Sequence, residues 1–311
     1  MSEMTTIPTP RHGEVDSHAG GHGAALPVVP VRHWGRWISG AVLVIVVASL
    51  LRSLATNPNL QFHVVRHYLF ASAVISGIRV TIELTALGML IGIVGGVLLG
   101  VMRLSGNPVL SGAAWTYVWF FRASPILVQL LFWGYLGAFY AHLSLTLPFT
   151  SITLASAQTS TLITPFVAAL LGLGLNEAAY AAETIRAGLN SVDEGQTLAA
   201  KALGYTPGQT LRLIVLPQAM RVIIPPLGNA TIIMLKTSAL VSVIGGRDLL
   251  TRVQDIYAQT FEVIPLLVVA TFWYLVLTTV LTLGQRQLER RFARSSRVTR
   301  EGRWGFGQSR S

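Results

Sequence analysis

The sequence predicts an all-α integral membrane protein with about six transmembrane helices, on the evidence of its composition and of the lengths of its apolar runs. Only 12% of the 311 residues are charged, where a soluble domain carries about 25%, and 52% are hydrophobic. So few charges would not cover a soluble globule of this size, which disfavours a soluble enzyme. The composition also excludes a disordered chain, and the absence of cysteine excludes a disulfide scaffold.

The apolar runs approach the roughly 20 residues that a helix needs to cross a bilayer. We place the spans at about residues 37–54, 79–102, 115–140, 162–182, 222–244 and 263–283. In the fifth run Pro225-Pro226 is expected to interrupt the helix and to leave backbone groups free. In the second run, glycines four residues apart lie on one helix face, which lets another backbone approach closely and predicts a helix–helix seam at Gly88, Gly92, Gly96 and Gly100.

These spans divide the chain into five parts. We predict a disordered cytoplasmic tail at residues 1–36, an extra transmembrane helix at 37–54, an extracytoplasmic linker with an interfacial segment at 55–78, a transmembrane core at 79–284 and a basic cytoplasmic tail at 285–311. Within the core, residues 141–161 and 245–262 are expected to be loops.

The distribution of Lys and Arg predicts the orientation in the membrane. Most of those outside the spans lie on the side of the two termini, and only Arg66, Arg247 and Arg252 lie opposite, which places both termini and residues 183–220 in the cytoplasm. The net charge of +10 therefore reflects topology, with the basic tail beside anionic lipid headgroups, and we expect no nucleic-acid partner.

Residues 183–220 form a long cytoplasmic segment with clear helix signals. Residues 193–196 (Asp-Glu-Gly-Gln) indicate a helix start, and Gly204 is expected to end this first short helix. Thr206-Pro207 opens a second helix, which Pro217 is expected to end. A compact helix–glycine–helix unit of this kind can press into the groove of a partner and pass force to the spans that it joins.

The same segment resembles the EAA loop of ABC-importer permeases. The matching positions are Ala199, Ala200, Gly204, Ile214, Leu216 and Pro217, preceded by Gly195 and Gln196. Leu198 stands where the family has the glutamate that names the loop. Three further stretches, at residues 122–129, 164–196 and 235–240, are similar to the polar amino acid branch of that family, and the resemblance covers about residues 70–293.

The resemblance implies a five-helix type I importer core preceded by one extra helix. The chain would be a multi-pass permease subunit of the bacterial inner membrane. It would pair with itself or with a similar permease, receive a polar amino acid from an extracytoplasmic binding protein, and bind ATP-binding cassette ATPase subunits through the EAA loop. The resemblance leaves open which amino acid is carried and whether the pair is a homodimer or a heterodimer.

We expect no enzyme activity, catalytic residue or cofactor in this chain. It has no G-x-x-x-x-G-K-[ST] phosphate loop, so ATP and Mg²⁺ would belong to the partner ATPase. His63 and His67 are four residues apart, but no acid lies near them in sequence, and we expect no metal site. A stand-alone secondary transporter or channel is the alternative; it would show inverted repeats, and the two halves of this sequence do not match convincingly.

Polar side chains inside the spans are costly in lipid and therefore suggest the substrate path. Glu177 is the candidate acceptor for an ammonium group. The alternatives are a structural ion pair of Glu177 with Arg186, and a role for Lys236 in dimer support or at the lipid interface. The candidates for the path are Arg122, Asn176, Glu177, Asn229 and Lys236.

Overall fold

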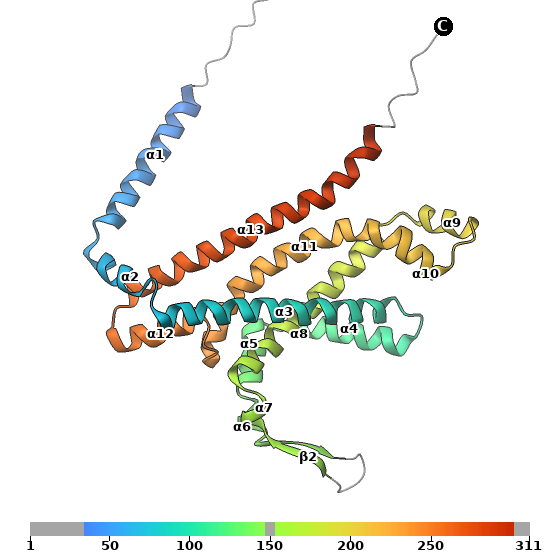
Figure 1. Cartoon of the computed structure of the whole chain (residues 1–311), viewed down its shortest axis with the longest axis horizontal. Coiled ribbons are helices and arrows are strands. Elements are labelled where there is room, and N and C mark those ends of the chain that lie inside the picture. Colours follow the sequence, from blue (N-terminus) through green and yellow to red (C-terminus); the bar gives the residue numbers. More distant parts are fainter. Residues whose placement is uncertain (1–33, 147–152, 302–311) are drawn as a thin grey trace, which may run out of the picture. The chain divides into compact units, whose positions relative to one another are not determined.

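The computed structural model describes residues 34–146 and 153–301, which are mostly helical (Figure 1). The chain separates into two compact units, residues 1–56 and 57–311. In the first unit the described element is α1 (Trp34–Ala55), whose apolar stretch Trp37–Leu50 is shorter than the full spans found in the second unit. Most of the predicted N-terminal tail, and residues 302–311 of the predicted basic tail, lie outside the described residues.

Four segments of the second unit are long and apolar enough to cross a membrane: Ser72–Leu104, Pro165–Asn190, Pro207–Ile244 and Val263–Arg291. They contain the predicted second, fifth and sixth spans and, from Pro165 on, the predicted fourth span. Their main helices are α3 (Ser72–Leu104), α8 (Pro165–Asn190), α11 (Leu216–Thr237) and α13 (Val263–Glu301). The predicted all-α membrane class is therefore confirmed.

The closest helix packing joins α3 to α8 along the predicted glycine seam. Gly88, Gly92, Gly96 and Gly100 are all buried on α3. A Cβ added at Gly92 would lie 2.5 Å from Glu177 Cγ, and one added at Gly96 would lie 2.5 Å from Ala181 Cβ. Both distances are far below van der Waals contact, so only glycine lets the two helices approach this closely.

The third predicted span is two helices rather than one. α4 (Pro108–Ala123) and α5 (Ile126–Gly134) are separated at Ser124 and Pro125. Proline has no N–H to donate, and it disfavours helical backbone in the residue before it, which explains the break. Both halves are apolar, so the sequence prediction treated them as one span.

A β-hairpin occupies much of the predicted loop at residues 141–161. After α6 (Leu136–Phe139) come the strands β1 (His142–Thr146) and β2 (Thr153–Gln158), and then α7 (Thr159–Leu162). The strands pair antiparallel, with His142 opposite Gln158. Figure 1 shows the hairpin extending from the α5–α7 end of the second unit.

Residues 183–220 are more helical than predicted. After α8 come α9 (Glu194–Ala202), α10 (Pro207–Thr210) and the π-helical turn η2 (Leu211–Val215), which leads directly into α11 and then η3 (Ser238–Ile244). Pro217 does not end a helix, as predicted, but lies in the first turn of α11, where its missing N–H would have no helical partner. The predicted interruption at Pro225-Pro226 is also wrong: both lie inside continuous α11, because the fixed φ of proline is helical.

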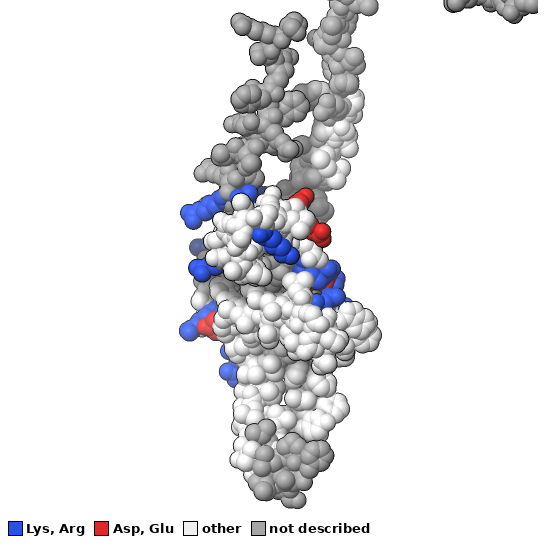
Figure 2. Space-filling model, turned by 90° about the vertical axis from the view of Figure 1, so that its right-hand side faces the viewer, with Lys and Arg blue, Asp and Glu red and all other residues white. Residues whose placement is uncertain are grey.

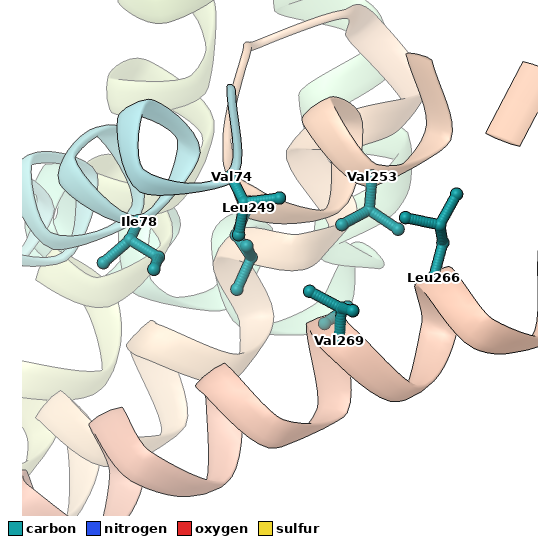
Figure 3. Close-up of a cluster of buried hydrophobic side chains, with 7 residues drawn as sticks. Val74, Ile78, Leu249, Val253, Leu266 and Val269 are labelled. Atoms are coloured by element: carbon teal, nitrogen blue, oxygen red, sulfur yellow. The ribbon is translucent and has the colours of Figure 1, made fainter. Parts of the chain in front are cut away.

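The predicted loop at residues 245–262 contains a helix, α12 (Leu249–Thr260). The Asp248 carboxylate caps it, accepting hydrogen bonds from the N–H groups of Leu250 (3.0 Å) and Thr251 (3.3 Å). One face of α12 packs against α3 and α13, near η1 (Pro58–Leu60) and α2 (Phe62–Tyr68). Figure 3 shows this buried cluster, which consists of Val74, Ile78, Leu249, Val253, Leu266, Val269 and Ala270.

Candidate coupling loop and substrate cavity

The segment from α9 to η2 is the candidate coupling loop, and its first helix has defined ends. The Asp193 side chain accepts a hydrogen bond from the Gly195 N–H (2.7 Å) at the start of α9. At the other end Gly204 has a φ of +81°, and the Tyr205 N–H donates to the Ala200 carbonyl (3.0 Å). This is a left-handed glycine turn, so the predicted helix stop at Gly204 is confirmed.

The second helix of the coupling loop begins at Thr206-Pro207, as predicted. The Thr206 N–H donates to Gln209 Oε1 (2.8 Å) and the Gln209 N–H donates to Thr206 Oγ1 (3.3 Å), which together form a capping box. Because η2 continues from α10 into α11, a displacement of α10 is passed to a membrane-spanning helix without an intervening flexible linker.

The coupling loop exposes leucines that a soluble protein would bury. Leu203 is 77% exposed, and Leu198, at the position of the family's glutamate, is 64% exposed. Ala200 is buried and Ile214 half-buried, so these two hold the loop together. The other predicted coupling residues are exposed, namely Gly195, Gln196, Ala199, Gly204, Leu216 and Pro217. Exposed apolar patches of this kind mark binding surfaces.

A cavity of about 600 Å³ lies between α8, α11 and the break between α4 and α5. We call it the first cavity. Its size is within the range of small-molecule sites. Lys236 is exposed on α11 and is not among the residues that line it. The other four predicted path residues do line it: Arg122, Asn176, Glu177 and Asn229.

Glu177 contributes a buried carboxylate oxygen to the first cavity. Its Oε1 has no hydrogen-bond partner among the described residues, which is a costly arrangement that a ligand with N–H groups would relieve. The predicted alternative, an ion pair of Glu177 with Arg186, is wrong. Arg186 Nε donates to Glu183 Oε1 (3.1 Å), and Arg103 Nη1 donates to Glu183 Oε2 (2.9 Å).

A buried amide pair holds the α4–α5 break in place. The Gln129 Nε2 donates to the carbonyls of Phe121 (3.0 Å) and Ser124 (3.1 Å), which the break leaves without helical partners. The Asn176 Nδ2 also donates to the Phe121 carbonyl (3.0 Å). Asn176 therefore serves the architecture of the cavity wall with its N–H groups. The sequence analysis did not single out Gln129, although it ends the stretch at residues 122–129.

Residues 34–146 and 153–301 contain no group of three His, Cys, Asp or Glu side chains that could hold a metal ion. His63 and His67 lie on α2, and the His67 ring packs edge-on against Tyr68.

A helical membrane core with a broken helix, a polar cavity inside it and a projecting helix–glycine–helix loop defines the class of protein as an importer permease. The chain belongs to the family described as binding-protein-dependent transport system inner membrane component, whose model matches residues 92–294. Members of this family are transport subunits that work with a separate ATPase, so this chain is not an enzyme.

Two curated relatives illustrate the match. The arginine transport system permease protein ArgU of Corynebacterium glutamicum is 46% identical over 271 residues, covering 87% of this chain and 84% of the relative. The glutamine transport system permease protein GlnP of Escherichia coli is 33% identical over 217 residues, covering 70% of this chain and 91% of the relative.

Solved structures agree on the fold. A crystal structure of an amino acid ABC transporter with histidines matches 70% of this chain and 94% of its own, with a TM-score of 0.59 and 33% identity. An inward-facing structure of the MetNI methionine ABC transporter, at 21% identity and a TM-score of 0.54, supports the fold alone.

Proposed function

We propose that this chain forms the translocation path for a polar amino acid in an ATP-binding cassette importer of the bacterial inner membrane. The observation that carries the proposal is the first cavity with the unpaired Glu177 oxygen. A zwitterion needs an acceptor for its ammonium and donors for its carboxylate. Glu177 supplies the acceptor, and Arg122 and Asn229 supply the donors. Relatives named for arginine and glutamine transport support this substrate class.

The coupling loop is the docking surface for the ATPase in this proposal. Its exposed leucines enter an apolar groove of the ATPase subunit, which holds the ATP and Mg²⁺, and the continuous path from α10 through η2 moves α11. ATP can drive the permease only through contacts that differ between its two states. The position of α11 meets this requirement, because α11 forms one wall of the first cavity.

The remaining partners are a second permease subunit and an extracytoplasmic binding protein. The family description names dependence on a binding protein, which supports the extracytoplasmic binding protein as a partner. Both termini and the coupling loop face the cytoplasm in this proposal, as the distribution of Lys and Arg predicts. Figure 2, a view of the α9–α10 side, shows charged side chains on the middle of that face and an uncharged surface toward the hairpin.

The test is reconstitution of the chain with its ATPase and binding protein in proteoliposomes, followed by ATP-dependent uptake of a panel of labelled amino acids. We expect Glu177→Gln to raise the KM of uptake roughly tenfold, since the amide keeps an acceptor oxygen but loses the charge that strengthens a hydrogen bond to an ammonium group. Glu83→Gln is the matched control, because Glu83 lies on α3 in an exposed pair with Arg79. Uphill uptake by the permease without its partners would contradict the proposal.

A further inference from the structure

Three cavities form a series along α8 toward the end that joins α9. The first cavity is lined by Glu177 and Tyr180, a second of about 470 Å³ by Tyr180 and Glu183, and a third of about 530 Å³ by Arg186 and Asn190. Residues three apart on a helix differ by about 60° in direction, so these side chains form a row that winds partly around α8. At 1.5 Å per residue the row is about 20 Å long, which takes it from mid-helix to the end of α8.

Neighbouring cavities are separated by side chains that they share. Arg122, Ala123 and Tyr180 line both the first and the second cavity. Arg103 and Trp115 line both the second and the third. Because the dividing walls are made of these side chains, rotamer changes can join the cavities while the helices stay in place.

Charges of opposite sign alternate along this row. The Glu177 carboxylate comes first, and the Arg122 guanidinium lies next, 5.3 Å from the centre of the Tyr180 ring. Glu183 follows, held by Arg103 and Arg186. A zwitterion that moves along such a row meets a partner for its ammonium or its carboxylate at each step, and so avoids the cost of an unpaired charge in a membrane interior.

We propose that the amino acid leaves the first cavity along this series of cavities between α4 and α8, and that Arg122 stacked on Tyr180 is the gate between the first and second cavities. The inference rests on the proposed function. A guanidinium forms charge-assisted hydrogen bonds with a carboxylate, and these are stronger than its cation–π contact with a ring face. The substrate carboxylate therefore draws Arg122 away from Tyr180 and opens the wall that the two residues form.

The route can be tested with single cysteines, because the chain has none of its own. Val118→Cys places a thiol in the second cavity and Ser111→Cys places one in the third. Thr116→Cys is the matched control, since Thr116 is exposed on the same helix and does not line these cavities. The reagent is a sulfonate-bearing methanethiosulfonate, and labelling of this chain is followed by mass spectrometry in the full reconstituted importer.

During ATP-driven uptake of L-arginine or L-glutamine, we expect slower labelling of Val118→Cys and Ser111→Cys and unchanged labelling of Thr116→Cys. Uptake without any change at the first two thiols would overturn the route and leave the proposed function intact. If the unmodified chain in its importer shows no ATP-dependent uptake of any amino acid, the proposed function fails, and the route fails with it.

The gate has its own test in the kinetics of uptake. Arg122→Gln is expected to lower kcat roughly tenfold, the loss typical of one hydrogen bond to a charged group, with partial rescue by Arg122→Lys. Tyr180→Phe keeps the ring face and should retain a higher kcat than Tyr180→Leu, which loses it. Equal rates in Tyr180→Phe and Tyr180→Leu, or an unchanged kcat in Arg122→Gln, would refute the gate.

Discussion

Gly92 holds Glu177 in position, and replacing it with alanine should weaken substrate binding without direct contact with the substrate. The new Cβ would lie 2.5 Å from Glu177 Cγ and 2.7 Å from Glu177 Cβ. Carbon atoms prefer separations of about 3.5–4.0 Å, so the Glu177 stem must move by about 1 Å. Such overpacking costs about 1–3 kcal/mol. If most of that energy is lost through displacement of the Glu177 carboxylate from the substrate, the Kd of the substrate rises roughly tenfold.

Gly96→Ala is the matched control for this prediction. Its Cβ would lie 2.5 Å from Ala181 Cβ and 3.0 Å from the Ala181 and Ala182 backbone, so it strains the same seam at least as strongly. Ala181 and Ala182 do not line the first cavity. The assay is binding of labelled amino acid to the detergent-solubilised importer, with thermal unfolding measured in parallel.

We expect both variants to unfold at lower temperature and only Gly92→Ala to lose affinity. Equal loss of affinity in the two variants would show that binding follows the general stability of the seam. An unchanged affinity in Gly92→Ala would refute the idea that this glycine positions Glu177.

The remaining predictions concern the coupling loop, the α4–α5 break and the α12 cap. Gly204→Ala should cost about 1–2 kcal/mol because its φ is +81°, and it should reduce co-purification of the ATPase, whereas Gly208→Ala, with open space around it, should not. Gln129→Leu should lower the thermal stability by about 1–3 kcal/mol, because it leaves the Ser124 carbonyl unpaired, whereas the Phe121 carbonyl keeps its hydrogen bond from Asn176. Burial raises the pKa of the Asp248 carboxyl. The contribution of this carboxyl to the stability of the fold is therefore greatest at low pH and is lost as the pH rises through the raised pKa. Asp248→Asn should flatten this dependence.

Each of these has an outcome that would contradict it. Normal ATPase retention in Gly204→Ala would show that the glycine turn is not needed for docking. Unchanged unfolding of Gln129→Leu would mean that water satisfies the Ser124 carbonyl. A pH profile of unfolding that is the same in Asp248→Asn and the unmodified chain would assign the titration to another group.

The parts of the fold that depend on neighbouring residues could be predicted from the sequence. Both ends of α9 and the start of α10 follow from Asp193, Gly204 and the Thr206-Pro207 pair, each of which acts within a few residues of itself. The seam on α3 follows from a four-residue glycine period. Pro217 and Pro225-Pro226 were misassigned because proline is favourable in the first turn of a helix, and inside a helix it removes a hydrogen bond without always ending the helix.

The candidate site was only partly predictable, for a different reason. The cost of charge in lipid singles out polar residues inside the spans, so Arg122, Asn176, Glu177 and Asn229 were found before any contact was known. Lys236 was predicted on the same ground but does not line the first cavity, and Arg186 was paired with the wrong glutamate, because the cost of charge in lipid says nothing about direction around a helix. Gln129 was missed because its two carbonyl partners exist only where α4 breaks.

Taken alone, the sequence determined that this chain belongs in a membrane, which of its segments are apolar enough to cross, and that it carries a helical coupling loop. These properties depend on the composition and the periodic spacing of contiguous residues. Composition decides whether a segment enters lipid, and spacing decides which residues share a helix face. Only the tertiary structure decided which polar side chains meet around the first cavity, that Glu177 keeps an unpaired oxygen there, and that α12 packs on α3 and α13. Those contacts form between helices that are far apart in the chain, and no local sequence pattern specifies which helices meet.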